Sequence, residues 1–199
     1  SAESVLRAAR IGVVGTADSD SEAEQVLDRV RTNPEGCARW LVLGWIGTHP
    51  DAKAAVLSRA WQIEEACRSG GLPALTLRCA PLVGAQSPLW RHLAHTRPGA
   101  AAYRPFQRVV EEDVVRLTRE VATGAPPHDG WFEVAGPEIM TLAELAEHAR
   151  RHASGNDAGE WEPDPDVLRE LPLVEPEIWM RAFGIDATSV THAASRWAA

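Results

Sequence analysis

One stretch of the chain, residues 37–84, limits the possible folds more than any other. Two short apolar runs, 40–43 and 74–79, flank a segment with helical character at about 52–69. Apolar runs without polar alternation are typical of parallel strands that are buried on both faces. The stretch therefore predicts one βαβ unit of an α/β fold with a parallel sheet.

Parallel sheets of this kind bind ligands beyond the carboxyl ends of their strands. Here those ends lead into two loops, 44–51 and 80–90. We therefore expect the functional site of the chain in these two loops.

The other elements follow from the same patterns. Ser21 with Glu24, and Thr141 with Glu144, have the spacing of capping boxes that open helices. Further strands are expected at 11–15, 107–110 and 131–134, and further helices after Ser21 and at 3–10, 89–95, 112–123 and 141–152. Strands that alternate with helices predict a sheet covered by helices.

The composition changes after residue 153. From there the chain is acidic, rich in proline and contains further tryptophans. We expect 1–153 to form an incomplete Rossmann-like domain and 154–199 to form a C-terminal appendage on the substrate side, packed over the carboxyl ends of the strands.

Charge and cysteine content exclude several classes of partner. The 199 residues carry a formal net charge of −8 without a basic cluster, which argues against nucleic acid and anionic membranes as partners. Three cysteines without C-x-x-C spacing favour a reduced, cytoplasmic protein. No apolar run is long enough to span a bilayer, and the first residues lack the apolar core of a signal peptide.

Several segments carry a likeness to a known family. They are Leu41-Val-Leu-Gly-Trp, LTLRCAPLVG, VVEEDVVRLTREV and FEVAGPEIMTLAELAEHA. In their order and spacing, these segments resemble the atypical, extended-type short-chain dehydrogenases/reductases, an NAD(P)-binding group with epimerase-like and NmrA-like members. The resemblance covers about 4–152 and implies a Rossmann-like parallel sheet with helices on both faces.

The sequence departs from the family where the dinucleotide would bind. In the family, a Gly-x-x-Gly-x-x-Gly turn after the first strand cradles the pyrophosphate. Residues 4–15 match the family's third helix and fourth strand, so the first three strands and this turn have no counterpart in the sequence. We therefore expect a truncated sheet and no nucleotide cofactor.

The family's catalytic Ser, Tyr and Lys are replaced as well. Matching the family pattern places the Ser at Gly44, the Tyr near Val56 and the Lys near Ala60. In the family the ammonium lowers the pKa of the phenol, so without this pair the usual hydride transfer is not expected. The single tyrosine, Tyr103, falls in a different loop.

Aromatic and small apolar residues surround the expected site. Trp45 and Trp90 belong to the two loops, and Trp61 belongs to the helix between them, where a core role is the alternative. These residues predict an aromatic-lined apolar pocket for a small-molecule substrate. The expected pocket residues are Gly44, Trp45, Val56, Ala60, Cys79, Val83 and Trp90.

Three residues are candidates for acid–base catalysis: His49, His92 and Glu112. His49 precedes Asp51, which can tune an imidazole or instead cap the following helix. His92 lies at the end of the second loop. Glu112 belongs to an acidic run at a helix start, where structural capping is the alternative role.

The histidines do not predict a metal site. The pairs His92/His95 and His148/His152 have helical spacing, but neither has a cysteine or carboxylate nearby in a ligand pattern. No metal is therefore expected.

Together these features predict a repurposed reductase-like protein that acts without a nucleotide cofactor on a small, largely apolar substrate, as a cyclase, isomerase or dehydratase. Two alternatives stay open: a non-catalytic NmrA-like binding or regulatory subunit, and one part of a split NAD(P)-dependent reductase or epimerase. A truncated sheet exposes an edge, so we also expect a homo-oligomer, a partner chain or folded-back terminal segments at that edge.

Overall fold

The fold is described from a computed structural model. It covers residues 10–33, 35–96, 104–124, 129–152 and 165–197. The helix expected at 3–10 and Tyr103 lie outside these residues, apart from Arg10. No helix among them combines the length and the apolar character needed to cross a bilayer.

A four-stranded parallel sheet forms the centre of the molecule. Its strands, in spatial order, are β1 (Ile11–Val14), β2 (Arg39–Trp45), β3 (Ala74–Cys79) and β7 (Gly130–Val134). All three strand pairs run in parallel, and Leu41 of β2 lies opposite Leu75 of β3. The expected α/β fold with a parallel sheet is confirmed.

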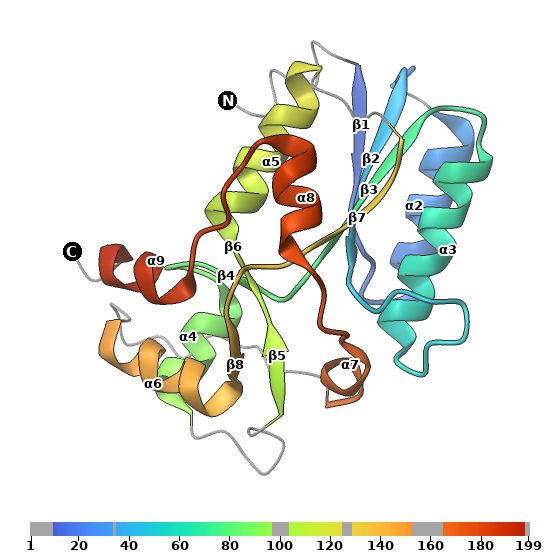
Figure 1. Cartoon of the computed structure of the whole chain (residues 1–199). Helices are drawn as coiled ribbons and strands as arrows, with labels where there is room; N and C mark the ends of the chain where they lie inside the picture. The colour runs from blue at the N-terminus through green and yellow to red at the C-terminus, as the bar shows by residue number, and fades with distance from the viewer. Residues whose placement is uncertain (1–9, 34, 97–103, 125–128, 153–164, 198–199) are drawn as a thin grey trace.

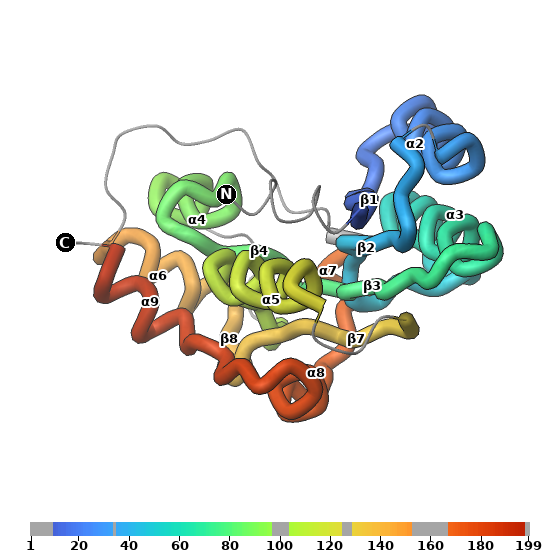
Figure 2. Tube along the Cα trace, turned by 90° about the horizontal axis from the view of Figure 1, so that it is seen from above, coloured from blue at the N-terminus to red at the C-terminus, as the bar shows by residue number. Residues whose placement is uncertain are grey.

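Helices cover both faces of this sheet (Figure 1). α2 (Asp20–Thr32) and α3 (Ala55–Ser69) lie on one face, and α5 (Glu111–Thr123) and α8 (Pro176–Phe183) lie on the other. The crossover from β3 through α5 to β7 therefore has the opposite hand to the two crossovers before it (Figure 2). Crossovers of opposite hand within one sheet are uncommon. The crossover of the unusual hand is also the one that contains a long excursion, between β3 and α5.

That excursion and the segments that follow β7 together build a second lobe from short elements. β4 (Leu82–Val83) pairs in parallel with β6 (Val109–Val110), and β5 (Pro105–Gln107) pairs antiparallel with β8 (Ile139–Thr141). The helices of this lobe are α4 (Pro88–His95), α6 (Leu142–His152) and α9 (Val190–Trp197). α7 (Pro165–Glu170) lies instead beside the loop that follows β2.

Side chains that alternate along the strands divide the core into two layers. Leu41 and Leu75 belong to the cluster on the α5 side, while Trp40 and Val42 belong to the cluster under α2 and α3. Trp40 is 1% exposed and fits only because its neighbour is Gly12, where an added Cβ would lie 2.2 Å from the indole. Packing on both faces explains why the strands read as continuous apolar runs.

Local capping signals were partly right. Thr141 and Glu144 form the expected capping box at the start of α6, with Glu144 accepting from the Thr141 backbone N–H and donating its own to Thr141 Oγ1. The cap expected at Ser21 is wrong, because α2 begins two residues earlier and Ser19 accepts from the backbone N–H of Glu22. Several polar residues in this acidic loop satisfy the N-cap preference equally well.

Arg29 partly blocks the outer edge of β1. The Arg10 carbonyl accepts from Ala38 toward β2, so the Val13 carbonyl, three residues later, faces the outer edge. Arg29 donates from Nη1 to that carbonyl at 3.1 Å. A charged side chain on an edge strand discourages pairing with another strand. A second chain at this edge stays a prediction.

Candidate functional site

Gly44, near the carboxyl end of β2, is the position that the resemblance assigns to the catalytic Ser. A Cβ added at Gly44 would lie 2.7 Å from Oε1 of Glu64, which projects from α3. That separation is too short for a side chain at position 44 while Glu64 keeps its place. Gly44 therefore makes room for a carboxylate of the neighbouring helix.

Arg78 of β3 holds Glu64 in this place. Its Nε and Nη2 donate to Glu64 Oε2 at 3.0 and 2.7 Å, and the Arg78 and Glu64 side chains are 11% and 7% exposed. Burial raises the pKa of Glu64, and Arg78 counteracts part of this effect. Arg78 belongs to one of the segments that carry the resemblance, and the structure pairs it with Glu64 as a buried ion pair between α3 and the sheet.

The positions assigned to the catalytic Tyr and Lys lie on α3. Ala60 is buried, and Val56 is half-buried against the main core. Cys79, at the end of β3, is also buried, and burial raises the pKa of its thiol to about 12. None of these three side chains exchanges a proton near neutral pH.

His49 lies in the loop between β2 and α3, and its side chain is 64% exposed. Its Nδ1 accepts from the backbone N–H of Asp51. Asp51 does not cap α3, contrary to the structural alternative considered for it. The N-cap residue is Ala54, which has no capping side chain, and Glu170 of α7 accepts from the backbone N–H groups of Lys53 and Ala54 just before the helix, each at 3.0 Å.

The tryptophans of the expected pocket lie in separate settings. Trp45 donates from Nε1 to Thr16 Oγ1 in the loop after β1, and Trp90 is fully buried on α4. Trp61 is half-buried on α3, with its ring centroid 6.5 Å from that of His49. A fully buried Trp90 does not line an open pocket in this structure.

The carboxyl ends of β4 and β6 form a second junction, at which α5 begins. Val83 and Val110 are paired in register there, and both are fully buried. The first turn of α5 carries Glu111, Glu112 and Asp113. The helix macrodipole favours negative charge at this position.

One of these three carboxylates is bonded within the fold, and a second lies close to a neighbouring glycine. Asp113 is fully buried and accepts from the Thr188 backbone N–H at 2.6 Å and from Thr188 Oγ1 at 2.8 Å, which ties the C-terminal segment to α5. Glu111 lies against Gly84, where an added Cβ would be 2.2 Å from Glu111 Oε2.

Glu112 has a different environment. It is exposed, and its Oε1 accepts from Nε1 of Trp197 in α9 at 2.9 Å. The Trp197 ring in turn meets Trp90 edge to face, with centroids 4.9 Å apart. Two residues of the expected site, Glu112 and Trp90, are thus joined through Trp197.

Sequence reasoning missed Trp197. It stands two residues before the last residue of the sequence, and no spacing relates it to Glu112, 85 positions earlier. The unusual number of tryptophans, eight, was the available signal. Tryptophan is a residue that often combines an apolar contact with one hydrogen bond, but the pairing needed the fold.

The other two acid–base candidates lie on different elements. His92 is a half-buried residue of α4, and its carbonyl accepts from the backbone N–H of Thr96. His49 belongs to the loop between β2 and α3, and α3 lies on the other side of the sheet from α4 (Figure 1). Within the described residues, no group of three or more His, Cys, Asp or Glu is placed to hold a metal ion.

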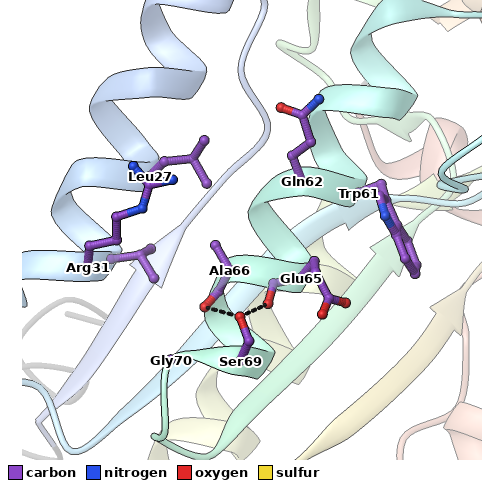
Figure 3. Close-up of a pocket in the computed structure, with 9 residues that line it drawn as sticks. Leu27, Arg31, Trp61, Gln62, Glu65, Ala66, Ser69 and Gly70 are labelled. Carbon is purple, nitrogen blue, oxygen red and sulfur yellow. Dashed lines mark hydrogen bonds between the residues drawn. The ribbon is translucent and has the colours of Figure 1, made fainter.

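Two cavities open along α3. One, of about 640 Å³, is the groove between α2 and α3, where Leu27 and Arg31 face Gln62 and Ala66 (Figure 3). The second, of about 460 Å³, lies between α3 and β7. None of the ten residues predicted for the site lines either cavity. The first is lined by α2 and α3, and the second by α3, β3, β7 and the residues just before these two strands.

Solved structures resemble this fold, although no family model and no curated protein matches the sequence. WbmG of Bordetella bronchiseptica in complex with NAD is 13% identical, with a TM-score of 0.63 over 98% of this chain and 75% of its own. UDP-N-acetylglucosamine 4-epimerase of Bacillus cereus is 10% identical, with a TM-score of 0.64 over 100% of this chain and 80% of its own.

A third structure gives the same result. The NADPH-dependent quinone oxidoreductase QOR2 of Escherichia coli, complexed with NADPH, is 15% identical, with a TM-score of 0.69 over 98% of this chain and 78% of its own. The resemblance is therefore confirmed at the level of the fold, which is that of the epimerase-like short-chain dehydrogenases/reductases. The chain spans three quarters of the length of WbmG.

Proposed function

We propose that this chain acts without a nucleotide cofactor on a small, largely apolar substrate, as a cyclase, isomerase or dehydratase. The observation that carries the proposal is the filled catalytic position: the Glu64 carboxylate occupies the space beside Gly44, and Val56 and Ala60 are core residues. These residues do not fit the nicotinamide chemistry of the family that the sequence resembles, which uses a phenol and an ammonium group. No hydride transfer is therefore proposed.

Glu112 is the acid–base residue that the surroundings favour. Its Oε1 is held by Trp197, and Oε2 has no partner among the described residues, so this oxygen is free to take or give a proton. The Trp197 ring offers apolar surface for the substrate next to the carboxylate. A base beside an aromatic ring suits a substrate that is mostly apolar and has one acidic C–H or O–H group.

His92 and His49 are the alternative acid–base residues. His92 is closer to this arrangement because α4 also carries Trp90, whereas His49 is an exposed residue beside α3. The three are distinguished by single substitutions to Gln, which remove the titrating group at similar size.

A non-catalytic binding or regulatory subunit is the second candidate function. The observation that favours it is the complete burial of Val83 and Trp90, two residues of the expected pocket. Under this proposal Glu112 and Trp197 hold α9 against α5 and perform no chemistry.

The first experiment asks whether the chain binds a dinucleotide. Titration with NADPH and with NAD, followed by tryptophan fluorescence, is expected to give no saturable quenching. Binding in the micromolar range by this chain would overturn cofactor independence. That result would instead favour a part of a split NAD(P)-dependent enzyme.

The second experiment separates catalysis from binding. The wild type, Glu112→Gln and Glu24→Gln are incubated with small-molecule extracts of the producing cells, and bound or converted molecules are identified by native mass spectrometry. We expect conversion by the wild type and by Glu24→Gln, a control at an exposed position of α2, and capture without conversion by Glu112→Gln. Unchanged conversion by Glu112→Gln would contradict the role of Glu112, and capture without conversion by all three would favour the binding subunit.

A further inference from the structure

We propose that the cavity between α3 and the edge strand β7 binds a small organic cation, such as a substituted ammonium. Its volume of about 460 Å³ lies within the range of small-molecule sites. No residue proposed above for catalysis lines it. The inference is therefore independent of the proposed function.

Two indole rings form walls of this cavity. Trp131 of β7 is 57% exposed, an uncommon state for so large an aromatic side chain. Trp61 of α3 lines the same cavity, and Figure 3 shows that it points away from α2. An open face of an indole attracts cations because the ring has a negative quadrupole.

Arg78 shows that the Trp131 ring accepts a cation in this fold. Its guanidinium carbon lies 4.6 Å from the ring centroid. The Arg78 side chain is 11% exposed and is held by its ion pair with Glu64, and Trp131 remains 57% exposed with Arg78 against it. Thr76, which also lines the cavity, adds a hydroxyl that is able to accept a hydrogen bond.

The charges that line the cavity also favour a cation. Three carboxylates, Glu64, Glu65 and Asp129, face two guanidinium groups, those of Arg68 and Arg78. Glu64 pairs with Arg78, and Glu65 pairs with Arg68.

Asp129 has no such partner. Among the described residues, none forms an ion pair with it. The lining of the cavity thus has one carboxylate more than it has guanidinium groups, and this carboxylate lies in the same cavity as two indoles. An anion would meet this uncompensated carboxylate, so we infer a cation as the ligand.

The test uses choline and its neutral isostere, in which a carbon replaces the ammonium nitrogen. Isotope-labelled full-length protein is titrated with each at constant ionic strength, and the indole N–H resonances are followed by NMR. We expect the signals of Trp61 and Trp131 to shift with choline and to shift much less with the isostere. Equal shifts with both molecules, or shifts confined to other tryptophans, would overturn the proposal.

Variants identify the groups responsible. Trp131→Ala is expected to weaken choline binding at least about fivefold, as loss of one cation–π contact implies. Trp131→Phe, which keeps a ring, is expected to retain more of the affinity, and Asp129→Asn to lose about twofold to fivefold, as for an exposed ion pair.

Ile139→Ala is the matched control, because Ile139 is similarly exposed, at 53%, and lies outside the cavity. It is expected to bind choline like the wild type. The indole signals of the core residues Trp40 and Trp179 report that each variant is folded. Wild-type affinity in a folded Trp131→Ala protein would contradict the assignment of the site.

Discussion

Two helices of this protein begin at the carboxyl ends of parallel strands, and their first turns are built differently. α3 has no capping side chain, and Glu170 of α7 accepts from the two backbone N–H groups just before the helix. The first turn of α5 carries three carboxylates. Asp113 accepts hydrogen bonds from Thr188, whereas Glu112 keeps one oxygen free of described partners. In this fold, a polar group that packing has already satisfied is not available for chemistry.

The two helices also differ in the residues that lie beside them. Beneath the start of α3, the buried pair of Glu64 and Arg78 fills the position assigned to the catalytic Ser. Beside the start of α5, Trp197 is half-buried and presents its ring next to an exposed carboxylate. The α3 region has become a structural junction, and the α5 region is where we propose chemistry.

Arg78→Met tests the α3 region and has the largest expected effect on the free energy of unfolding. It leaves Glu64 buried without a counter-charge, so we expect the free energy of unfolding to fall by about 3–5 kcal/mol at neutral pH. Urea unfolding followed by tryptophan fluorescence measures the change. The exposed pair partner Arg68 is the control, since Arg68→Met is expected to cost about 0–1 kcal/mol.

The fall in the free energy of unfolding caused by Arg78→Met should depend on pH in a defined direction. Burial places the pKa of Glu64 in the folded protein above its unfolded value. A carboxyl with a raised pKa contributes its full stability below the unfolded pKa and loses it as the pH rises through the folded pKa. The deficit of Arg78→Met should therefore shrink in acid, because a protonated Glu64 needs no counter-charge. A deficit that is constant with pH would show that the missing packing of Arg78 dominates instead.

Asp113→Asn tests the structural carboxylate of the α5 region. It weakens the charge-assisted bonds to Thr188 and Arg116, and we expect a loss of about 1–3 kcal/mol in the free energy of unfolding. Urea unfolding is again the measurement. Glu112→Gln, one residue earlier, should cost under about 1 kcal/mol. If Glu112→Gln were as destabilising as Asp113→Asn, Glu112 would be a structural residue as well.

Glu170→Ala tests the hydrogen bonds between α7 and the residues just before α3 and has the smallest expected effect. Losing such hydrogen bonds at exposed amides costs about 0.5–1.5 kcal/mol. Hydrogen exchange should report faster exchange at the amides of Lys53 and Ala54, which donate to Glu170. Unchanged protection at these two amides would mean that the loop is held by other contacts, such as the packing of Gly47 against the Glu170 backbone.

Local patterns predicted the secondary structure well. The bounds of β3 agree with the expectation from its apolar run, and the capping box of Thr141 and Glu144 opens α6 as expected. Both signals involve neighbours in the sequence, so they need no tertiary information. The shift from Ser21 to Ser19 at α2 shows the limit of such signals where several capping residues follow one another.

The sites depended on contacts between distant residues. Glu170 accepts from Lys53 across 117 positions, Trp197 reaches Glu112 across 85, and Thr188 reaches Asp113 across 75. No local spacing encodes these pairs, because each forms only when the C-terminal helices pack against the sheet and the second lobe. Trp131 and Trp61 likewise share a cavity only because β7 pairs with β3 beside α3.

The sequence by itself determined the parallel sheet and its alternation with helices, since apolar periodicity and capping residues are local properties, and the expectation that Gly44, Val56 and Ala60 stand where the resembled family has catalytic residues rests on residue identity alone. Only the tertiary structure decided which polar groups are paired within the fold and which remain available for chemistry. That decision depends on the three-dimensional surroundings of each group: Glu64 is neutralised within the core beside Gly44, whereas Glu112 meets the solvent and a single indole N–H.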